Sequence, residues 1–277
     1  MPPDARPALP THRRPPGRGI PWPVGVLAAI AALLFALPLL GLLQRAGWSS
    51  LWEDLSTPAA RDALRLSLEC SLWSTALSVV LGVPLAWVLA RGEFPGRALL
   101  RALVLLPMVL PPVVGGVALL YAFGRSNGLV GPWLYDTFGL QLTFSKTGVV
   151  LAETFVAMPF LVLTVEGGLR AIDGRYEDAA STLGAGRWTT FRRVTLRFLA
   201  PSLAAGAALA WARALGEFGA TITFAGNIAG RTQTTPLAVY LLLETQPTAA
   251  VALSLVLLAV SVVVLVALRD RWFGIRR

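Results

Sequence analysis

Apolar residues gather into six runs, and polar residues separate them. A hydrocarbon core of about 30 Å requires roughly 20 mostly apolar residues in a single helix. Runs of about that length lie at residues 22–43, 64–90, 99–123, 147–166, 198–218 and 249–268. The pattern predicts an all-α, polytopic membrane protein with about six transmembrane helices. Composition agrees, because 55% hydrophobic and 14% charged residues are too apolar a mixture for a water-soluble domain of 277 residues.

The first run has two interpretations. A basic start followed by an apolar stretch also describes a secretory or twin-arginine signal. However, the run exceeds the usual signal core of about 7–15 residues, and no small-x-small cleavage site follows Leu43. We therefore expect a disordered basic leader at 1–21 and an additional transmembrane helix at 22–44.

Arginine placement predicts the orientation. The N-terminal leader, the loops at 91–101 and 170–197, and the tail at 269–277 hold 17 of the 24 basic residues. An even number of spans brings all four segments to one side, which the positive-inside rule identifies as the cytoplasm. Both termini are thus expected in the cytoplasm. The basic balance is a topology signal, and no nucleic-acid partner is expected.

Several kinds of chemistry lack the residues they need. His12 and Cys70 are the sole histidine and cysteine, so neither an intrachain disulfide nor a His/Cys metal cluster can form. The phosphate-binding pattern G-x-x-x-x-G-K-[ST] is missing. A membrane-embedded enzyme is not expected, because the spans contain no His/Asp or Ser/Lys constellation. We expect no catalytic residue, metal or cofactor in this chain, so energy for uphill work would come from another chain.

Acidic residues in or near the spans fall into two groups. Glu217 follows Arg213 by four residues in an apolar helix, so this pair should face protein or a water-filled cavity. Other glutamates lie near span ends, where a side chain reaches the headgroups. They are Glu69, which also follows Arg65 by four residues, Glu153, Glu166 and Glu244. A proton relay stays open, although no chain of His and acidic residues supports it.

Helix breakers concentrate in the third run. Pro107, Pro111, Pro112, Gly115 and Gly116 lie within about ten residues. Proline removes a backbone donor and clashes with the preceding turn, so this helix must kink or break. Broken backbone at membrane depth is tolerated where it lines a cavity or packs in protein. We favour a translocation-path element over a kinked packing helix.

The stretch 170–197 is polar and arginine-rich between two apolar runs. It predicts a helix at Arg175–Leu183, a turn at Gly184–Gly186 and a second helix at Trp188–Leu196. Tyr176, Ala179, Ala180 and Leu183 recur at i, i+3, i+4 and i+7 and give a small apolar face beside Glu177 and Asp178. An amphipathic helix on the headgroups would suit the Trp188 half. The acidic, alanine-rich half favours docking of a cytosolic protein.

This segment resembles the EAA loop of permease subunits of bacterial ABC importers. The matching residues are Asp178-Ala179-Ala180, Gly184 after three residues, and Val194-Thr195-Leu196 after nine more. The resemblance implies a cytoplasmic coupling helix seated in a groove of an ABC ATPase subunit, which would carry ATP and Mg. The coupling residues would be Glu177, Asp178, Ala179, Ala180, Leu183 and Gly184. Two departures occur: Asp178 stands at the Glu position and keeps its charge, and Arg197 replaces a proline, which affects how the next helix begins.

Three further segments are similar to permeases of molybdate importers: Leu105–Val114, Leu134–Ser145 and Ala212–Tyr240. Sulfate and thiosulfate permeases share parts of them and are the close alternative. The resemblance covers about 61–268 and implies a type I ABC importer transmembrane domain with coupling loop 170–197. It also implies a periplasmic or lipoprotein oxyanion-binding protein, surrounding lipid, and a pore formed with a second copy or a sister chain, of which we expect a homodimer.

Candidate pathway or gate residues combine the helix breakers, the ion pair and polar residues after the fifth span. They are Pro107, Pro111, Pro112, Arg213, Glu217, Thr221, Thr223, Asn227 and Arg231. An alternative of another class is a membrane scaffold or passive channel that binds a cytosolic regulator through the same loop. A neighbouring gene for an ATPase with a phosphate-binding loop would favour the importer.

Overall fold

The computed structural model describes residues 21–272, in two units that are described separately. The expected leader up to residue 20 and the last five residues of the expected tail lie outside the described residues. In the first unit, α1 (Trp22–Gln44) is a 23-residue apolar helix of membrane-spanning length. Every regular element in residues 21–272 is a helix, which confirms the all-α prediction.

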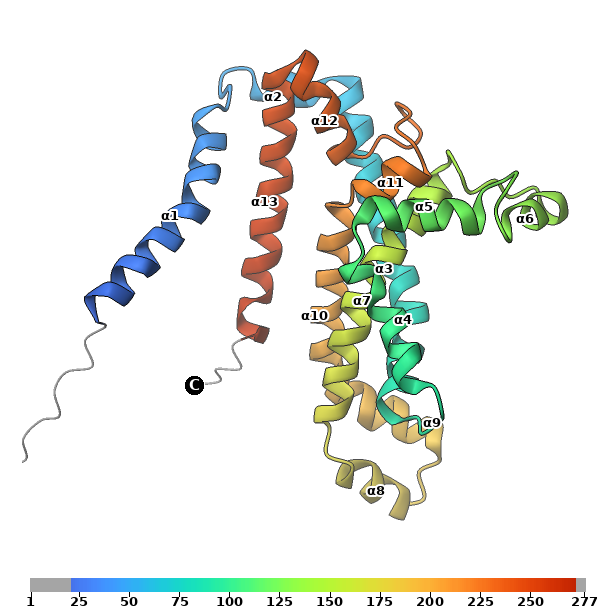
Figure 1. Ribbon diagram of the computed structural model, residues 1–277. Helices are drawn as coiled ribbons and strands as arrows, with labels where there is room; N and C mark the ends of the chain where they lie inside the picture. The colour runs from blue at the N-terminus through green and yellow to red at the C-terminus, as the bar shows by residue number, and fades with distance from the viewer. Residues whose placement is uncertain (1–20, 273–277) are drawn as a thin grey trace, which may run out of the picture. The chain divides into compact units, whose positions relative to one another are not determined.

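Three long helices form the centre of the second unit: α3 (Pro58–Arg91), α7 (Lys146–Ala171) and α10 (Leu196–Leu215) (Figure 1). Their fully buried side chains include Leu89, Leu161 and Leu199. The fourth long helix, α13 (Pro247–Trp272), packs on α10 and α12 (Thr235–Thr245). Each long helix contains an apolar window of membrane length.

Small residues bring α3 close to its neighbours. Ser67, Ser71, Ser74 and Ser78 recur at one- and two-turn spacing, and all are buried. Such residues allow transmembrane helices to approach closely. The hydroxyl of Ser71 also accepts a hydrogen bond from Nε1 of Trp211 on α10, at 2.9 Å. Thus one face of α3 is built for packing against α7 and α10.

The third apolar run breaks where its prolines predict. Helix α4 (Arg97–Val109) ends just before Leu110, and α5 (Pro112–Phe123) begins after Pro111. Extended backbone at Leu110 and Pro111 separates the two pieces. At 13 and 12 residues, neither piece alone has membrane-spanning length. Hence five helices among the described residues are long and apolar enough to cross a membrane, and the third predicted run forms two shorter helices in place of a sixth.

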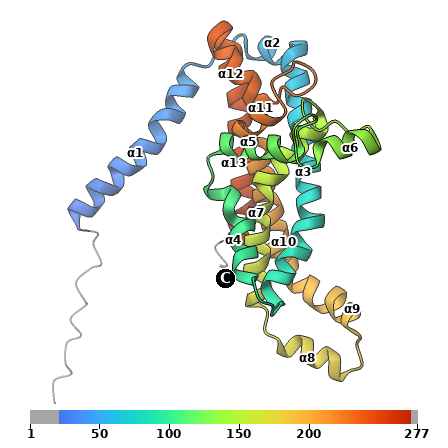
Figure 2. The ribbon, with the colours of Figure 1, turned by 45° about the vertical axis from the view of Figure 1, so that its right-hand side comes forward.

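Short helices lie at the two ends of the second unit (Figures 1 and 2). At one end, named here the α8 end, are α8 (Arg175–Thr182), α9 (Arg187–Thr190) and a π-helical turn, η1 (Phe191–Thr195). Toward the other, the α6 end, α2 (Leu51–Ser56) and α12 lie at the tip; α11 (Gly219–Phe224) and α6 (Gly131–Phe138), which projects sideways, lie farther in. The separate helix expected at Trp188–Leu196 is not found, because α9, η1 and α10 run on without interruption as one helical segment.

Candidate functional site

Helix α8 stops at the glycine of the EAA-like pattern. Gly184 has a φ of +81°, and its N–H donates to the carbonyl of Ser181 at 3.0 Å. The N–H of Ala185 donates to the carbonyl of Ala180 at 3.0 Å. These two bonds form a Schellman motif, which favours glycine because other residues are strained at positive φ. The spacing from Ala180 to Gly184 therefore sets where α8 ends.

Much of α8 is open to another molecule. Asp178 and Ala179 are exposed, and the side chain of Leu183 at the end of α8 is 88% exposed. Ala180 is half-buried. Tyr176 anchors the helix to α10, since its ring lies 4.7 Å from that of Phe198, centroid to centroid. The expected docking residues thus present a small, mixed apolar and acidic surface.

Glu177 points into its own chain and not outward. Its Oε1 atom accepts a hydrogen bond from the hydroxyl of Thr195 at 2.9 Å and lies 3.4 Å from Nη2 of Arg91, the last residue of α3. The sequence placed Glu177 in one set with Asp178, but the two adjacent acids face different surroundings. Arg91 and Thr195 were missed, because partners 86 and 18 positions away leave no local signal.

Glu166 does not reach the headgroups as expected. Its side chain is 5% exposed and pairs with Arg101 of α4 and, at 2.9 Å, with Arg170 of α7. The contact with α4 covers the carboxylate, which is why the end of the span does not expose it. The Arg170 pair follows i,i+4 spacing and was open to prediction, whereas the Arg101 pair depends on the tertiary fold.

Glu153 also departs from the headgroup expectation. It is 1% exposed, and its Oε2 atom has no hydrogen-bond partner among residues 21–272. Val149 and Ala157, one turn to either side on α7, are fully buried, so this face of α7 is packed inside the protein. By contrast, Glu69 pairs with Arg65 at 2.7 Å as the spacing predicted.

Helices α5 and α11 cross at very short range. A Cβ added to Gly116 would lie 2.6 Å from Cβ of Thr223, and one added to Gly219 would lie 2.7 Å from Cβ of Pro112. Glycine at both positions is what allows the crossing. The structure therefore brings Pro112 and Thr223, expected from separate segments, to one place. Thr221, on the same short helix, is fully buried, and its hydroxyl has no partner in the described part of the chain.

Glu217 holds the corner between α10 and α11. Its carboxylate pairs with Arg213, as predicted, and its Oε1 atom accepts a hydrogen bond from the N–H of Ala220 at 2.9 Å. The setting differs from the expectation, because α10 ends at Leu215 and Glu217 follows it. The pair consequently joins the end of one helix to the start of the next.

The remaining pathway candidates are scattered. Pro107 lies inside α4, two residues before the helix ends. Asn227 follows α11, with its Oδ1 atom buried and without a partner among residues 21–272. Arg231 lines a separate polar pocket of about 320 Å³ that also contains Arg65 and Lys146. The crossing and the Glu217 corner are thus the coherent part of the predicted set.

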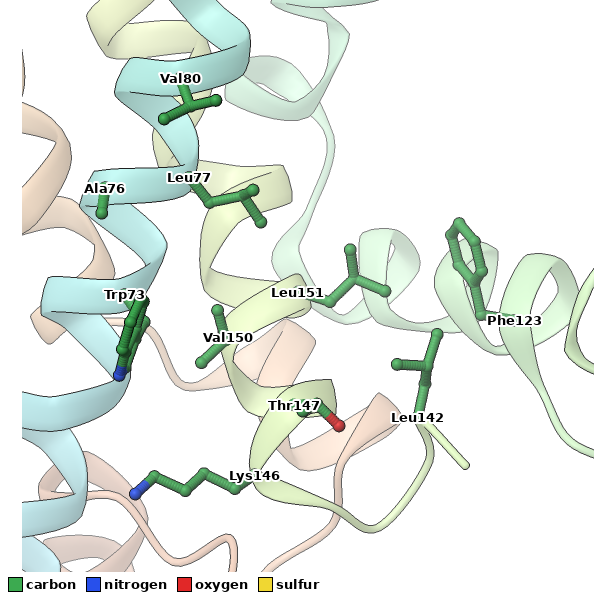
Figure 3. Close-up of a pocket in the computed structure, with 10 residues that line it drawn as sticks. All are labelled: Trp73, Ala76, Leu77, Val80, Phe123, Leu142, Lys146, Thr147, Val150 and Leu151. Carbon is green, nitrogen blue, oxygen red and sulfur yellow. The ribbon is translucent and has the colours of Figure 1, made fainter. Parts of the chain in front are cut away.

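A larger cavity of about 630 Å³ lies between α3 and α7 (Figure 3). Trp73, Leu77 and Val150 are among the mostly apolar side chains that line it. Its one charged residue, Lys146, is paired with Glu69. An oxyanion would lose hydration there without gaining comparable partners, so this cavity does not suit an oxyanion.

Comparison with known families decides the kind of protein. Residues 79–274 match the family described as the binding-protein-dependent transport system inner membrane component. The chain belongs to this transport family. It is a multi-pass membrane protein, and the matched region takes in both α8 and the α5/α11 crossing.

Two relatives show how far the likeness to other members of the transport family extends. The molybdenum transport system permease protein ModB of Mycobacterium tuberculosis is 50% identical over 248 residues, covering 88% of this chain and 92% of the relative. The sulfate transport system permease protein CysT of Escherichia coli is 39% identical over 251 residues, covering 89% and 90%.

A solved structure supports the fold. The crystal structure of a bacterial ABC transporter involved in the import of the acidic polysaccharide alginate contains a chain with a TM-score of 0.73 and 17% identity. The match covers 92% of this chain and 96% of that one. The expected importer permease fold is confirmed, at low sequence identity.

Proposed function

We propose that this chain is the transmembrane permease subunit of an ATP-driven importer that moves molybdate or tungstate across the bacterial cytoplasmic membrane. The observation that carries the proposal is the 50% identity to a ModB permease over 88% of this chain. The same alignment includes 92% of the relative, so the likeness is not confined to one shared segment.

The proposed orientation places the α8 end and both termini in the cytoplasm. The positive-inside rule supports it, because 17 of the 24 basic residues fall in the four segments assigned to that side. The α6 end then faces outward. There a periplasmic or lipoprotein oxyanion-binding protein would deliver its load.

The proposed partner at the α8 end is an ABC ATPase subunit. Asp178, Ala179 and Leu183 are exposed on α8 and offer it a small-residue surface with one acidic group. ATP and Mg would bind that subunit, and this chain would need no cofactor. A second copy of the permease would complete the pathway within the lipid, and the two permeases would contact two ATPases on the cytoplasmic side.

Transport in this proposal involves no covalent chemistry in the permease. Closure of the ATPases would displace α8 and convert an inward-open pathway to an outward-open one. A divalent tetrahedral anion in transit needs polar lining but no tight site, since it must also leave. The α5/α11 crossing is the proposed gate: Thr223 lies against Gly116 and Gly219 against Pro112, and the buried Thr221 is on the same short helix as Thr223.

Sulfate or thiosulfate is the second candidate cargo. The CysT relative is 39% identical over a similar length, and sulfate is also a divalent tetrahedral anion. A scaffold or passive channel is the alternative of another class. Unlike the importer, it would pass solute without ATP.

The decisive experiment is uptake by the complex of this chain, its ATPase and its binding protein in liposomes. We expect ATP-dependent accumulation of molybdate that excess tungstate blocks and excess sulfate does not. Competition by sulfate would assign the cargo to sulfate. Uptake that is equal with and without ATP would refute the importer itself.

A further inference from the structure

The two adjacent acids of α8 have different environments. Asp178 is exposed, whereas the side chain of Glu177 is 24% exposed and faces two other elements of its own chain. One oxygen, Oε1, accepts from Thr195 at 2.9 Å and meets Arg91 at 3.4 Å. Arg91 ends α3, and Thr195 ends the π-helical turn that leads into α10. A single carboxylate therefore joins α8 to two membrane spans.

Thr195, the hydroxyl partner of Glu177, is the last residue of the π-helical turn, which sets the direction of its side chain. Such turns are rare, and they occur frequently at functional sites. An extra residue in one turn shifts the register of the following side chains by about 100°. In this turn Phe191 packs edge-on against Trp87 of α3, with centroids 5.1 Å apart, and Thr195 is fully buried. The turn is therefore held against α3 while its last hydroxyl meets Glu177.

The end of α3 is itself fixed to α4. Nε of Arg97 donates to the carbonyl of Leu89 at 2.9 Å, and Nη2 of Arg97 lies 3.4 Å from the carbonyl of Ala90. These bonds occupy carbonyls in the last turn of α3, which would otherwise lack helical partners. Movement of Arg91 consequently engages α4 as well as α3. Glu177 thus contacts Arg91 at the end of α3 and Thr195 before α10, and α4 is linked to the same place through the end of α3.

We infer that Glu177 is an internal latch, a positioning residue that transmits displacement of α8 to α3 and α10 and does not itself dock the ATPase. The inference rests on the proposed function. It assigns separate tasks to the two neighbouring acids, with Asp178 facing the partner and Glu177 facing the spans. A competing explanation is that Glu177, in the first turn of α8, merely favours the helix dipole.

The test uses the full complex in liposomes, with molybdate as the transported probe. The variants are Glu177→Gln, Arg91→Gln and the two combined, and Glu53→Gln, at an exposed position of α2, is the matched control. We expect each single variant to keep its ATPase subunit during purification and to lower molybdate imported per ATP hydrolysed by about two- to thirtyfold. The double variant should lose no more than the worse single variant, because both remove one interaction. The control should match wild type.

A second pair separates the latch from the dipole explanation. Thr195→Val removes the hydroxyl at nearly constant volume, and Thr195→Ser keeps it. We expect the valine variant to lose coupling and the serine variant to retain it. A dipole role for Glu177 predicts that both Thr195 variants transport normally, and that result would overturn the latch.

Other outcomes also decide. Loss of the ATPase subunit from the Glu177→Gln complex would make Glu177 a docking residue. An unchanged ratio of molybdate to ATP in that variant, or losses that simply add in the double variant, would likewise reject the latch. Failure of the proposed function is distinct, because the wild-type complex would then show no ATP-dependent molybdate uptake.

Discussion

Replacing Gly116 with alanine should strain the crossing of α5 and α11. The added Cβ would lie 2.6 Å from Cβ of Thr223, 2.9 Å from the carbonyl oxygen of Ala220 and 3.1 Å from its Cα. Nonbonded carbon atoms ordinarily approach to about 3.5–4.0 Å. The clash is therefore close to 1 Å, and two of the three atoms belong to the backbone. Relief requires α11 to move as a whole.

Gly115 is the matched control, one residue away on the same helix. A Cβ there would lie 3.2 Å from Cε1 of Phe155, the end of a side chain that can rotate. Both replacements gain the same helix propensity, about 1 kcal/mol in favour of alanine. The difference between them isolates the clash, which overpacking data place at about 1–3 kcal/mol.

Thermal unfolding of the purified permease in detergent measures this difference. We expect Gly116→Ala to unfold about 2–12 °C below Gly115→Ala, from about 2–4 °C per kcal/mol for chains of this size. Molybdate uptake should fall in the first variant and persist in the second. Midpoints that agree within measurement error would show that α11 yields freely and that the crossing is not tightly packed.

Three further predictions follow from the ends and interior of the bundle. Gly184→Ala should impose about 1 kcal/mol of backbone strain at φ +81° and lower molybdate uptake. The control is Gly186→Ala, where φ is −66° and the space for a Cβ is equally open, and this variant should take up molybdate normally. Equal effects of the two substitutions on uptake would show that backbone strain at Gly184 is not the cause. Glu166→Gln removes the charge of a buried carboxylate that pairs with both Arg101 and Arg170, and should lower the free energy of unfolding by about 1–3 kcal/mol. The control, Glu244→Gln at an exposed position, should leave the melting temperature unchanged. An unchanged melting temperature in Glu166→Gln would show that these ion pairs do not stabilise the fold. Glu153→Gln removes a buried carboxylate without a partner among the described residues and should hold or raise the melting temperature; a marked loss of stability would mean that the carboxylate has a partner in the complete assembly.

Local patterns in the sequence predicted the parts of this fold that depend on local physics. Proline chemistry placed the break between α4 and α5, and glycine chemistry placed the end of α8 at Gly184. Spacing of four residues predicted the pairs Arg65–Glu69 and Arg213–Glu217. Each of these depends on residues within a few turns of one another, which is the range that periodicity and propensity describe.

Surroundings of the buried acids could not be predicted in the same way. Glu153 and Glu166 lie near the ends of apolar runs, so the sequence suggested exposure to headgroups. Packing of α7 on its neighbours buries both side chains. The partner of Glu166, Arg101, lies 65 positions away in the sequence. The direction of Glu177 was missed for the same reason. Tertiary contacts decide whether the charged group of a long side chain is exposed or buried, and which residue it contacts.

The helical segment from Arg187 to Leu215 connects the contacts of Glu177 at α8 with the corner that Glu217 forms before α11. At about 1.5 Å per residue, its 29 residues extend about 43 Å. Thr195 near its first turns meets Glu177 of α8, and Arg213 in its last turn meets Glu217 before α11. Since Glu217 is 1% exposed, Arg213→Gln would leave a buried carboxylate with only the Ala220 N–H and should cost about 3 kcal/mol. If this segment carries the motion of α8 to the proposed gate, Arg213→Gln should lose molybdate uptake while still binding the ATPase. Arg213→Lys, which keeps the positive charge, should recover part of the uptake. Full uptake by Arg213→Gln would mean that the motion reaches the gate by another route.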